Sequence, residues 1–433
     1  MTNLTKLRIH RFRRVQPNTE LHFTPSLNIV LGRNGAGKTT LLNLVAMVLR
    51  SDFSEILTEE FVIEYELLLP AGGITVVVGN RAKESKVPAS LPVNQEEAAI
   101  RLATESGSVE QTCEVRIKLT DAAEVVVRGT GTELTLERSG QPPERRTTPA
   151  MLNGNLFFNA IWPFLNAFEN DSVMVNALYE LSVSATFPSV RRFDESLDCL
   201  RDTTESQTFF FWQPPNGSAV FPPLSAGPVE LLQAIGKRLS ENPEEDAIRF
   251  SHQELGFLKE AVDLLGFASA ELKADRLERV VSDAVNKFTH VRFGKLKFDF
   301  TRNDGSAIDH ARLSYGQKRM LMFLYYLASN KYFVVADELV NGLHHEWIDA
   351  CMAALGTRQA FMTSQNPLLL DYLPFSSPNH ARSSFILCKT ALLGTRERLV
   401  WSHMSQKDAD AFFNAYKIGI EHVSEILRTR GMW

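Results

Sequence analysis

The pattern of hydrophobic and polar positions divides the 433-residue chain into three parts. Near the N-terminus, short apolar segments lead to a largely apolar segment at 27–31, and apolar residues then recur at helical spacing over 40–50. This order predicts two strands, a buried strand and a helix. From 61 to about 137 the period falls to two, which predicts an antiparallel β-rich subdomain interrupted by a charged loop at 81–97.

Helical spacing dominates the middle of the chain. The helices it predicts are at 229–239, 253–265 and 271–288, with the aromatic, turn-rich segment 209–217 as a packed loop. Beyond 290, strands at 291–293 and 296–300 precede alternating helices and strands, as in a parallel α/β sheet, and 405–430 is expected to be helical. We therefore expect three domains: 1–150, a helical insertion lobe at 151–289, and 290–433.

Composition and charge restrict the possible partners. A hydrophobic content of 44% is enough for a sizeable core, and a net charge of −5 gives no overall attraction to nucleic acid or anionic membranes. The four cysteines are scattered, without the spacing of a zinc site, and are expected to be reduced thiols. Because the chain has neither a membrane-length apolar run nor a signal peptide's apolar region, we expect a cytoplasmic protein that does not bind membranes.

The segment 32–39 has the complete pattern G-x-x-x-x-G-K-[ST], between the buried strand and the helix. Glycines allow the backbone to curl, so that several N–H groups point at a phosphate, and the helix N-terminus adds partial positive charge. Lys38 is expected to reach the β- and γ-phosphates of ATP, and the Thr39 hydroxyl to ligate Mg²⁺. The expected nucleotide-binding residues are Gly32, Asn34, Gly35, Ala36, Gly37, Lys38, Thr39 and Thr40.

A hydrophobic strand at 332–336 ends in two acids, Asp337 and Glu338. In a nucleotide-binding sheet, the ligand lies at the carboxyl ends of the strands. We therefore expect Asp337 to hold Mg²⁺ and Glu338 to orient and deprotonate the attacking water. A solvated acidic turn fits the same residues when they are taken alone, but the glycine loop favours the catalytic interpretation.

A third motif, at 313–317, directly precedes an expected helix at 318–329. The Ser314 hydroxyl, the Gly316 backbone N–H and Gln317 stand at the N-terminus of that helix, where an anion binds favourably. This site contains no lysine, which suits a γ-phosphate presented by another subunit. An N-capping serine followed by a turn glycine is an equally good interpretation.

The order of these motifs resembles ABC-type ATPases, and among them the SMC/RecF-like heads. The segment 313–317 is similar to the L-S-G-G-Q signature, with Tyr315 in place of the first glycine. The run 337–344 resembles the D-E-x-E-N-G-L-H of RecF-like AAA ATPases of the overcoming-lysogenization and anti-phage defence groups, with Val340 in place of the usual acid. The segments 7–13 and 361–371 are similar to the L-x-I-x-N-F-R and T-T-H-S-P-x-L-L-D segments of the same group.

This resemblance implies an α/β fold: an ABC-type ATPase head with a mixed central sheet, an antiparallel β-subdomain and a helical insertion. It also assigns the position of the family's switch histidine, which contacts the γ-phosphate, to Gln365. Glutamine can donate a hydrogen bond to a phosphate oxygen but cannot transfer a proton. We therefore expect Gln365 to act in catalysis with Lys38 and Glu338, and hydrolysis to be slow.

Two further groups have competing interpretations. The run 344–346 (His-His-Glu) could hold a metal ion, but the close of the motif at 337–344 explains His344 better, and no third ligand stands at zinc spacing. A basic N-terminal cluster could contact DNA phosphates or the nucleotide, or form a solvated strand face. Its members are Lys6, Arg8, His10, Arg11, Arg13 and Arg14.

Together these features predict an Mg-ATP-dependent ATPase that is at least a dimer. ATP is expected between Lys38 and Asp337 of one chain and Ser314 and Gly316 of another. One hypothesis is a sensor or scaffold of a prokaryotic anti-phage defence complex with a separate effector subunit, a nuclease or a toxin, because the chain contains no recognisable nuclease centre. The alternative is a DNA-repair or chromosome-maintenance ATPase that clamps DNA in its ATP-bound dimer.

Overall fold

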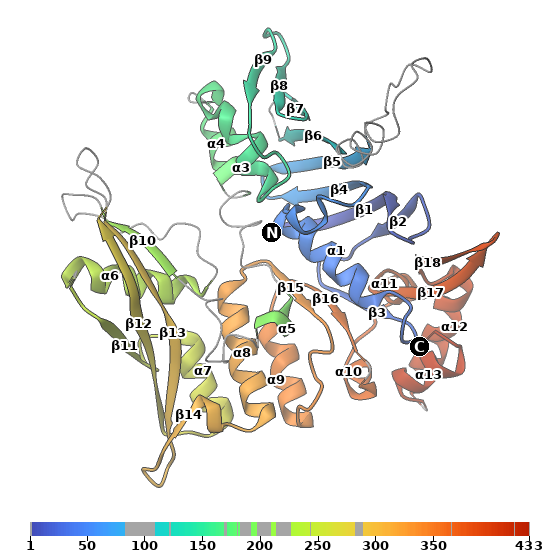
Figure 1. The fold of residues 1–433 in the computed structure, drawn as a ribbon. Helices are drawn as coiled ribbons and strands as arrows, with labels where there is room; N and C mark the ends of the chain where they lie inside the picture. Colours follow the sequence, from blue (N-terminus) through green and yellow to red (C-terminus); the bar gives the residue numbers. More distant parts are fainter. Residues whose placement is uncertain are drawn as a thin grey trace, which may run out of the picture.

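The computed structural model (Figure 1) describes residues 2–82, 109–120, 123–168, 171–179, 181, 192–196, 209–213, 227–242, 244–281, 289–364, 366–419 and 421–432. Most of the expected charged loop at 81–97 lies outside these ranges, as do residues 214–217 of the segment 209–217 and Gln365.

A five-stranded sheet in the order β15-β16-β3-β17-β18 forms the centre of the molecule. The bounds are β3 (Leu27–Leu31), β15 (Phe333–Ala336), β16 (Gln359–Thr363), β17 (Phe385–Leu393) and β18 (Arg396–His403). Strand β3 is parallel to β16 and β17, β15 is parallel to β16, and β18 is antiparallel to β17. The strand before the glycine loop is thus paired on both sides with strands from the far end of the chain.

Alternate residues of β3 enter two different hydrophobic cores. Ile29 and Leu31 pack in the core that contains helices α8 (Tyr315–Ser329) and α9 (His345–Leu355). Val30 faces the core formed by α1 (Lys38–Arg50) and the antiparallel subdomain. Because both faces of the sheet are covered, its inner strands are apolar almost throughout.

The predicted β-rich subdomain is an eight-stranded antiparallel sheet in the order β2-β1-β4-β5-β6-β7-β8-β9. Its strands are β1 (Asn3–Phe12), β2 (Thr19–His22), β4 (Phe61–Leu69), β5 (Gly72–Ala82), β6 (Val109–Leu119), β7 (Val125–Thr130), β8 (Glu133–Arg138) and β9 (Glu144–Thr147). Burial alternates along β4, as the period of two requires. The α/β fold class, with a mixed central sheet and an antiparallel β-subdomain, is therefore confirmed.

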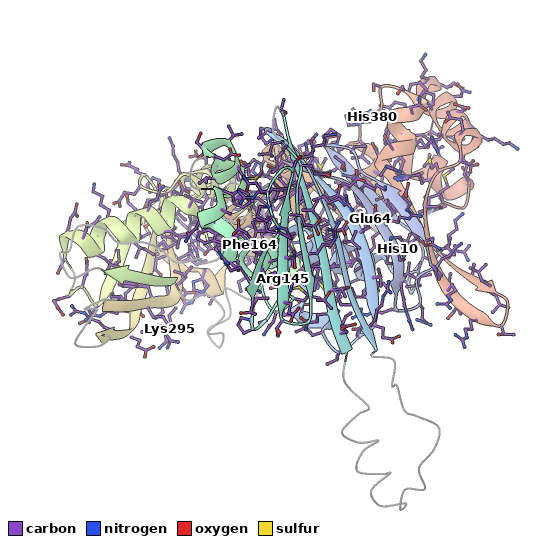
Figure 2. All side chains as sticks on the ribbon, turned by 90° about the horizontal axis from the view of Figure 1, so that it is seen from above. His10, Glu64, Arg145, Phe164, Lys295 and His380 are labelled. Carbon is purple, nitrogen blue, oxygen red and sulfur yellow. The ribbon has the colours of Figure 1, made fainter. Side chains whose placement is uncertain are left out.

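Short helices before β4 and after β9 pack onto the same core. They are η1 (Ser54–Ile56), α3 (Leu156–Ala160), η2 (Trp162–Phe168) and α4 (Ser172–Tyr179). Leu156, Phe164 and Met174 are buried together with the strands of the sheet. In the view from above, Phe164 and Arg145 are labelled near the middle of the molecule, between Lys295 on one side and His380 on the other (Figure 2). The expected domain boundaries stay predictions.

A buried glutamine links the two sheets. The Gln359 side chain, at the start of β16, accepts a hydrogen bond from Leu4 N (2.8 Å) and donates to the carbonyls of Leu4 (2.8 Å) and Thr24 (2.7 Å). Leu4 belongs to β1 of the antiparallel sheet, so the contact crosses from one sheet to the other. Each part of this buried amide therefore has a partner, as a buried polar group requires.

The insertion contains the expected helices α6 (Val229–Glu241) and α7 (Gly256–Leu265), with the short α5 (Phe193–Ser196). It also contributes to a sheet in the order β10-β13-β12-β11, with β14 paired to β13. The bounds are β10 (Phe209–Gln213), β11 (Ala247–Ser251), β12 (Ser269–Val281), β13 (Thr289–Thr301) and β14 (Ala307–Asp309). Figure 1 shows this sheet at one end of the molecule, beside α6 and α7.

Two sequence-based expectations for this region are wrong. The helix at 271–288 is replaced by β12 over its described part, and 209–213 is a strand instead of a loop. Ala270, Leu272 and Ala274 alternate into the core. Pairing of β12 with β11 and β13 outweighs the three- and four-residue spacing of apolar side chains further along the segment. The two strands expected at 291–300 are one strand, β13.

The remaining short helix, η5 (His310–Arg312), lies against β13, where His310 Nδ1 accepts a hydrogen bond from Phe298 N at 3.2 Å. The C-terminal side of the central sheet carries α10 (Pro367–Asp371), α11 (Pro378–Ser384), α12 (Gln406–Ile418) and α13 (Val423–Thr429), and the last two confirm the expected helical end. Cys113, Cys351 and Cys388 are buried free thiols, and burial raises the pKa of each to about 12. Within the described part of the chain, no helix combines the length and the apolar character needed to cross a bilayer.

The spacing of buried side chains along β12 provides a test that it is a strand. In a strand, residues 272 and 274 share a face, whereas in a helix they lie on opposite sides. Leu272→Asp and Ala274→Asp should therefore each lower the free energy of unfolding by more than about 2 kcal/mol, since both side chains are buried. The matched variant Lys273→Gln should change it by less than about 1 kcal/mol. Denaturant unfolding measures all three, and tolerance of Asp at either buried position would contradict the strand.

Candidate nucleotide site

The glycine loop connects β3 to α1 and depends on glycine at particular positions. Gly35 and Gly37 have φ values of 81° and 85°, which favour glycine. A Cβ on Gly32 would lie 2.3 Å from the carbonyl oxygen of Cys388 on β17, so no side chain fits there. The backbone can therefore take the tight curve that a phosphate-binding loop requires.

Lys38, the first residue of α1, is largely buried within this loop. Its Nζ donates to the carbonyl oxygens of Gly32 (2.8 Å) and Arg33 (3.3 Å). The N-terminus of the 13-residue helix α1 has no side-chain cap, so its backbone N–H groups are directed at the space next to the loop. A cation and a helix N-terminus at one place form a favourable anion site.

Thr39 and Asp337 meet across the central sheet although 298 positions separate them. Thr39 Oγ1 donates to Asp337 Oδ2 at 2.7 Å, and Thr363 Oγ1, at the end of β16, donates to Asp337 Oδ1. Hydroxyl and carboxylate oxygens are the hard ligands that Mg²⁺ prefers. The chemistry of this donor pair fits the expected Mg²⁺ site.

These residues border an open cavity of about 260 Å³. Its lining consists of Asn34, Gly35, Gly37, Lys38, Thr39, Thr40, Asp337 and Glu338. The glycine loop and the acidic strand end are thus brought together, as the sequence predicted. Gly32 and Ala36 instead line a second cavity, of about 420 Å³, which Asn34 shares with residues of β17.

Glu338 has an unusual backbone conformation, with φ at 52°, in the left-handed region that non-glycine residues rarely adopt. Its carboxylate accepts a hydrogen bond from the Asn341 side chain, and its backbone N–H donates to Thr363 Oγ1 at 3.0 Å. Its carbonyl oxygen accepts from Arg319 and from Asn341 N, the latter at 3.1 Å. The expected general base is therefore held on several sides.

The signature segment lies at the start of α8 and does not line the 260 Å³ cavity of its own chain. Ser314 Oγ accepts from Gln317 N (3.2 Å), and Gln317 Oε1 accepts from Ser314 N (3.0 Å), which forms a capping box. The capping interpretation of Ser314 is thus correct for the single chain, and Gln317 takes part in the cap. Phosphate binding by Ser314 and Gly316 stays a prediction.

Sequence reasoning missed three residues around the acids. Arg192 on the insertion has Nη1 3.7 Å from Asp337 Oδ2. Thr363 and Arg319 contact the two acids directly, as described above. The sequence carried little signal for them, since Arg319 directly follows Lys318 at the start of the apolar run 320–328 of an expected helix.

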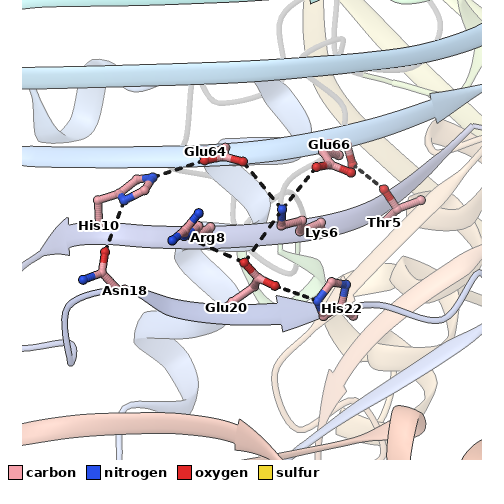
Figure 3. A network of polar contacts seen from close by, with 9 residues as sticks. All are labelled: Thr5, Lys6, Arg8, His10, Asn18, Glu20, His22, Glu64 and Glu66. Carbon is pink, nitrogen blue, oxygen red and sulfur yellow. Dashed lines mark hydrogen bonds and ion pairs between the residues drawn. The ribbon is translucent and has the colours of Figure 1, made fainter.

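The basic N-terminal cluster is paired with glutamates (Figure 3). Lys6 Nζ lies 3.3 to 3.7 Å from Glu66, Glu64 and Glu20. Although partial burial lowers the pKa of Lys6, its hydrogen bond to Glu66 and the nearby carboxylates raise that pKa above its ordinary value. Further pairs are Arg8–Glu20, His10–Glu64, Arg11–Glu60, Arg13–Glu59 and Arg14–Glu397. This charge balance favours the solvated strand face over a phosphate-binding surface.

The ligand atoms of His344, His345 and Glu346 lie within 4.8 Å of one another, and all three residues are exposed. They stand at the N-terminus of α9, whose partial positive charge disfavours a cation.

Comparisons with known proteins place the two halves of the site in two family models. An AAA domain model matches residues 6–145, which include the glycine loop. A model described as an AAA domain, putative AbiEii toxin, Type IV TA system, matches residues 200–371, which include the signature and both acids. The sequence-based resemblance to AAA-type P-loop ATPases is therefore confirmed. A search among curated proteins finds no match.

Solved structures similar to this chain include heads of SMC proteins. An SMC head bound to the C-terminal winged-helix domain of ScpA is 12% identical with a TM-score of 0.39, and covers 93% of this chain and 98% of its own. The SMC head domain from Thermotoga maritima is 10% identical with a TM-score of 0.34, covering 92% and 98%. The SMC head with a coiled coil and joint from Pyrococcus yayanosii is 9% identical with a TM-score of 0.36, covering 96% and 100%. TM-scores this low support no detailed equivalence.

The Thr39–Asp337 pair predicts how nucleotide binding responds to magnesium. Asp337→Asn removes the negative charge that favours a divalent cation but keeps a hydrogen-bonding side chain. We expect this variant to lose most of the Mg²⁺-dependent gain in ATP affinity while its magnesium-free affinity stays within about threefold of wild type. Titration of a fluorescent ATP analogue with and without Mg²⁺ measures both, with the exposed Glu397→Gln as control. If the ATP affinity of Asp337→Asn still rises with Mg²⁺ as much as in wild type, Asp337 does not bind the metal.

Proposed function

We propose that the chain, which two AAA-domain family models match, binds and hydrolyses Mg-ATP in a composite site shared by two copies. The observation that carries this proposal is the separation of the two halves of the site within one chain. Lys38, Thr39, Asp337 and Glu338 line one cavity, whereas Ser314, at the exposed start of α8, lies outside it. A second copy supplies the missing half.

In this proposal each residue of the site has a defined task. Lys38 and the N–H groups of the loop bind the phosphates, and Thr39 with Asp337 holds Mg²⁺. Glu338 orients the attacking water and accepts its proton. Ser314 and the N-terminus of α8 bind the γ-phosphate presented by the other copy. Binding of ATP then favours the closed dimer, and hydrolysis releases it.

The biological task that we propose is that of a sensor or scaffold subunit in a prokaryotic anti-phage defence complex, with a separate nuclease or toxin as effector. The toxin-related description of the family model that matches 200–371 supports this task. A DNA-clamping repair or chromosome-maintenance ATPase is the alternative. The glutamate pairing of the N-terminal basic cluster supports it less, since clamping DNA requires cations available for phosphates. ATPase activity that DNA stimulates, with a steep salt dependence, would favour the clamp.

Mixing two inactive variants tests the composite site. Lys38→Ala removes the phosphate-binding cation but keeps the signature, whereas Ser314→Arg blocks the signature but keeps the glycine loop. Each is expected to be inactive alone, and an equimolar mixture should recover up to about a quarter of wild-type ATPase activity, because half of the dimers are mixed and one of their two sites is intact.

The matched control for this experiment is Ser306→Arg, which places the same side chain at an exposed position between β13 and β14 and should keep wild-type activity. If the mixture is as inactive as its components, while Ser314→Arg alone still binds ATP, two copies do not share the site.

Phage challenge tests the biological task. Cells that carry the chain with the genes that flank it should form fewer plaques on infection than cells without them. Lys38→Ala should abolish this protection, because a subunit that cannot bind ATP cannot close its dimer, and Glu397→Gln should keep it. Protection that persists with Lys38→Ala, or that is absent for every phage with the wild-type genes, would contradict the defence assignment.

A further inference from the structure

Tyr315 occupies the signature position at which the resembled family has glycine, and it is conspicuously exposed, at 61%. Its ring lies directly on the loop that follows the two acids. A Cβ added to Gly342 would come within 2.7 and 2.8 Å of ring atoms Cε1 and Cδ1. Gly342 also has a positive φ of 75°, so the ring and a glycine-only backbone fit against each other.

Arg319, one helical turn after Tyr315, connects this ring to the acids. It is 4% exposed, and its guanidinium Nη1 and the Tyr315 hydroxyl are 3.2 Å apart in a hydrogen bond. Nε donates to the carbonyl of Leu339 at 2.6 Å, and Nη2 donates to the carbonyl of Glu338. The guanidinium therefore holds two consecutive peptide groups with a fixed planar fork.

The peptide groups that Arg319 holds include the strained one. Glu338 keeps its φ of 52° only if its surroundings determine it, since a free glutamate would relax to negative φ. That relaxation would redirect its side chain, which now lines the cavity with Lys38 and Thr39. The hydrogen bonds from Arg319 are thus placed to decide where the carboxylate points.

We propose that Tyr315 and Arg319 are positioning residues that hold Glu338 in its strained, catalytically aimed conformation. The inference rests on the proposed function, in which a second copy's nucleotide docks at Ser314, next to Tyr315. A nucleotide bound at Ser314 would contact the Tyr315 ring, whose hydroxyl accepts the hydrogen bond from Arg319. Each signature therefore completes the partner's site and, through Tyr315, sets the direction of the carboxylate in its own.

The test compares Tyr315→Phe, which removes only the hydroxyl, and Tyr315→Gly, which restores the family's glycine and removes the ring. Both changes are at an exposed residue, so folding is preserved, and thermal unfolding verifies this. We expect kcat for ATP to fall at least about threefold in Tyr315→Phe and further in Tyr315→Gly, with KM within twofold of wild type. Tyr372→Phe, which removes another exposed hydroxyl, should leave both unchanged.

Dimer formation is measured separately, by sedimentation with ATP in a Glu338→Gln background. We expect the Tyr315 variants to form as much dimer as their parent. If they lose the dimer in proportion to their activity, Tyr315 is an interface residue and the inference is wrong. If kcat is unchanged in both variants, the inference is also wrong. If the parent itself forms no dimer with ATP, the proposed function fails instead.

Discussion

The parallel pairing of β3 with β16 and β17 is the constraint on which the rest of the structure depends. It places the glycine loop, which leaves the carboxyl end of β3, beside the carboxyl ends of strands that the chain forms some 300 residues later. Without this register Thr39 and Asp337 would not meet, because no covalent or local feature joins them. The large antiparallel subdomain and the insertion are accommodated outside this pairing, on the two sides of the central sheet.

Much of this arrangement follows from the sequence where a motif and a period agree. The glycine loop and the acidic end of β15 each combine a motif with an apolar strand, and β4 follows from its period of two alone. Prediction failed for β12, where apolar spacing suits a helix but edge-to-edge pairing with β11 and β13 determines the strand. The contacts of Arg192 and Arg319 with the acidic strand end could not be foreseen either, because they depend on how distant segments pack.

The site itself combines rigid and strained parts. Asp337 is held by two hydroxyls, from Thr39 on α1 and from Thr363 at the end of β16. The next residue, Glu338, has a backbone conformation that only its neighbours maintain. Asp337 is therefore held from α1 and β16, and Glu338 from β16, α8 and the loop after β15. The Asp337 carboxylate can therefore keep its place when the contacts around Glu338 change.

The amide of Gln359 has a mechanical consequence. Its two hydrogen bonds to Leu4 would break together if the antiparallel sheet slid against the central one, and each broken bond would leave a buried polar group unsatisfied. The interface between the two sheets is thus stiff to shear.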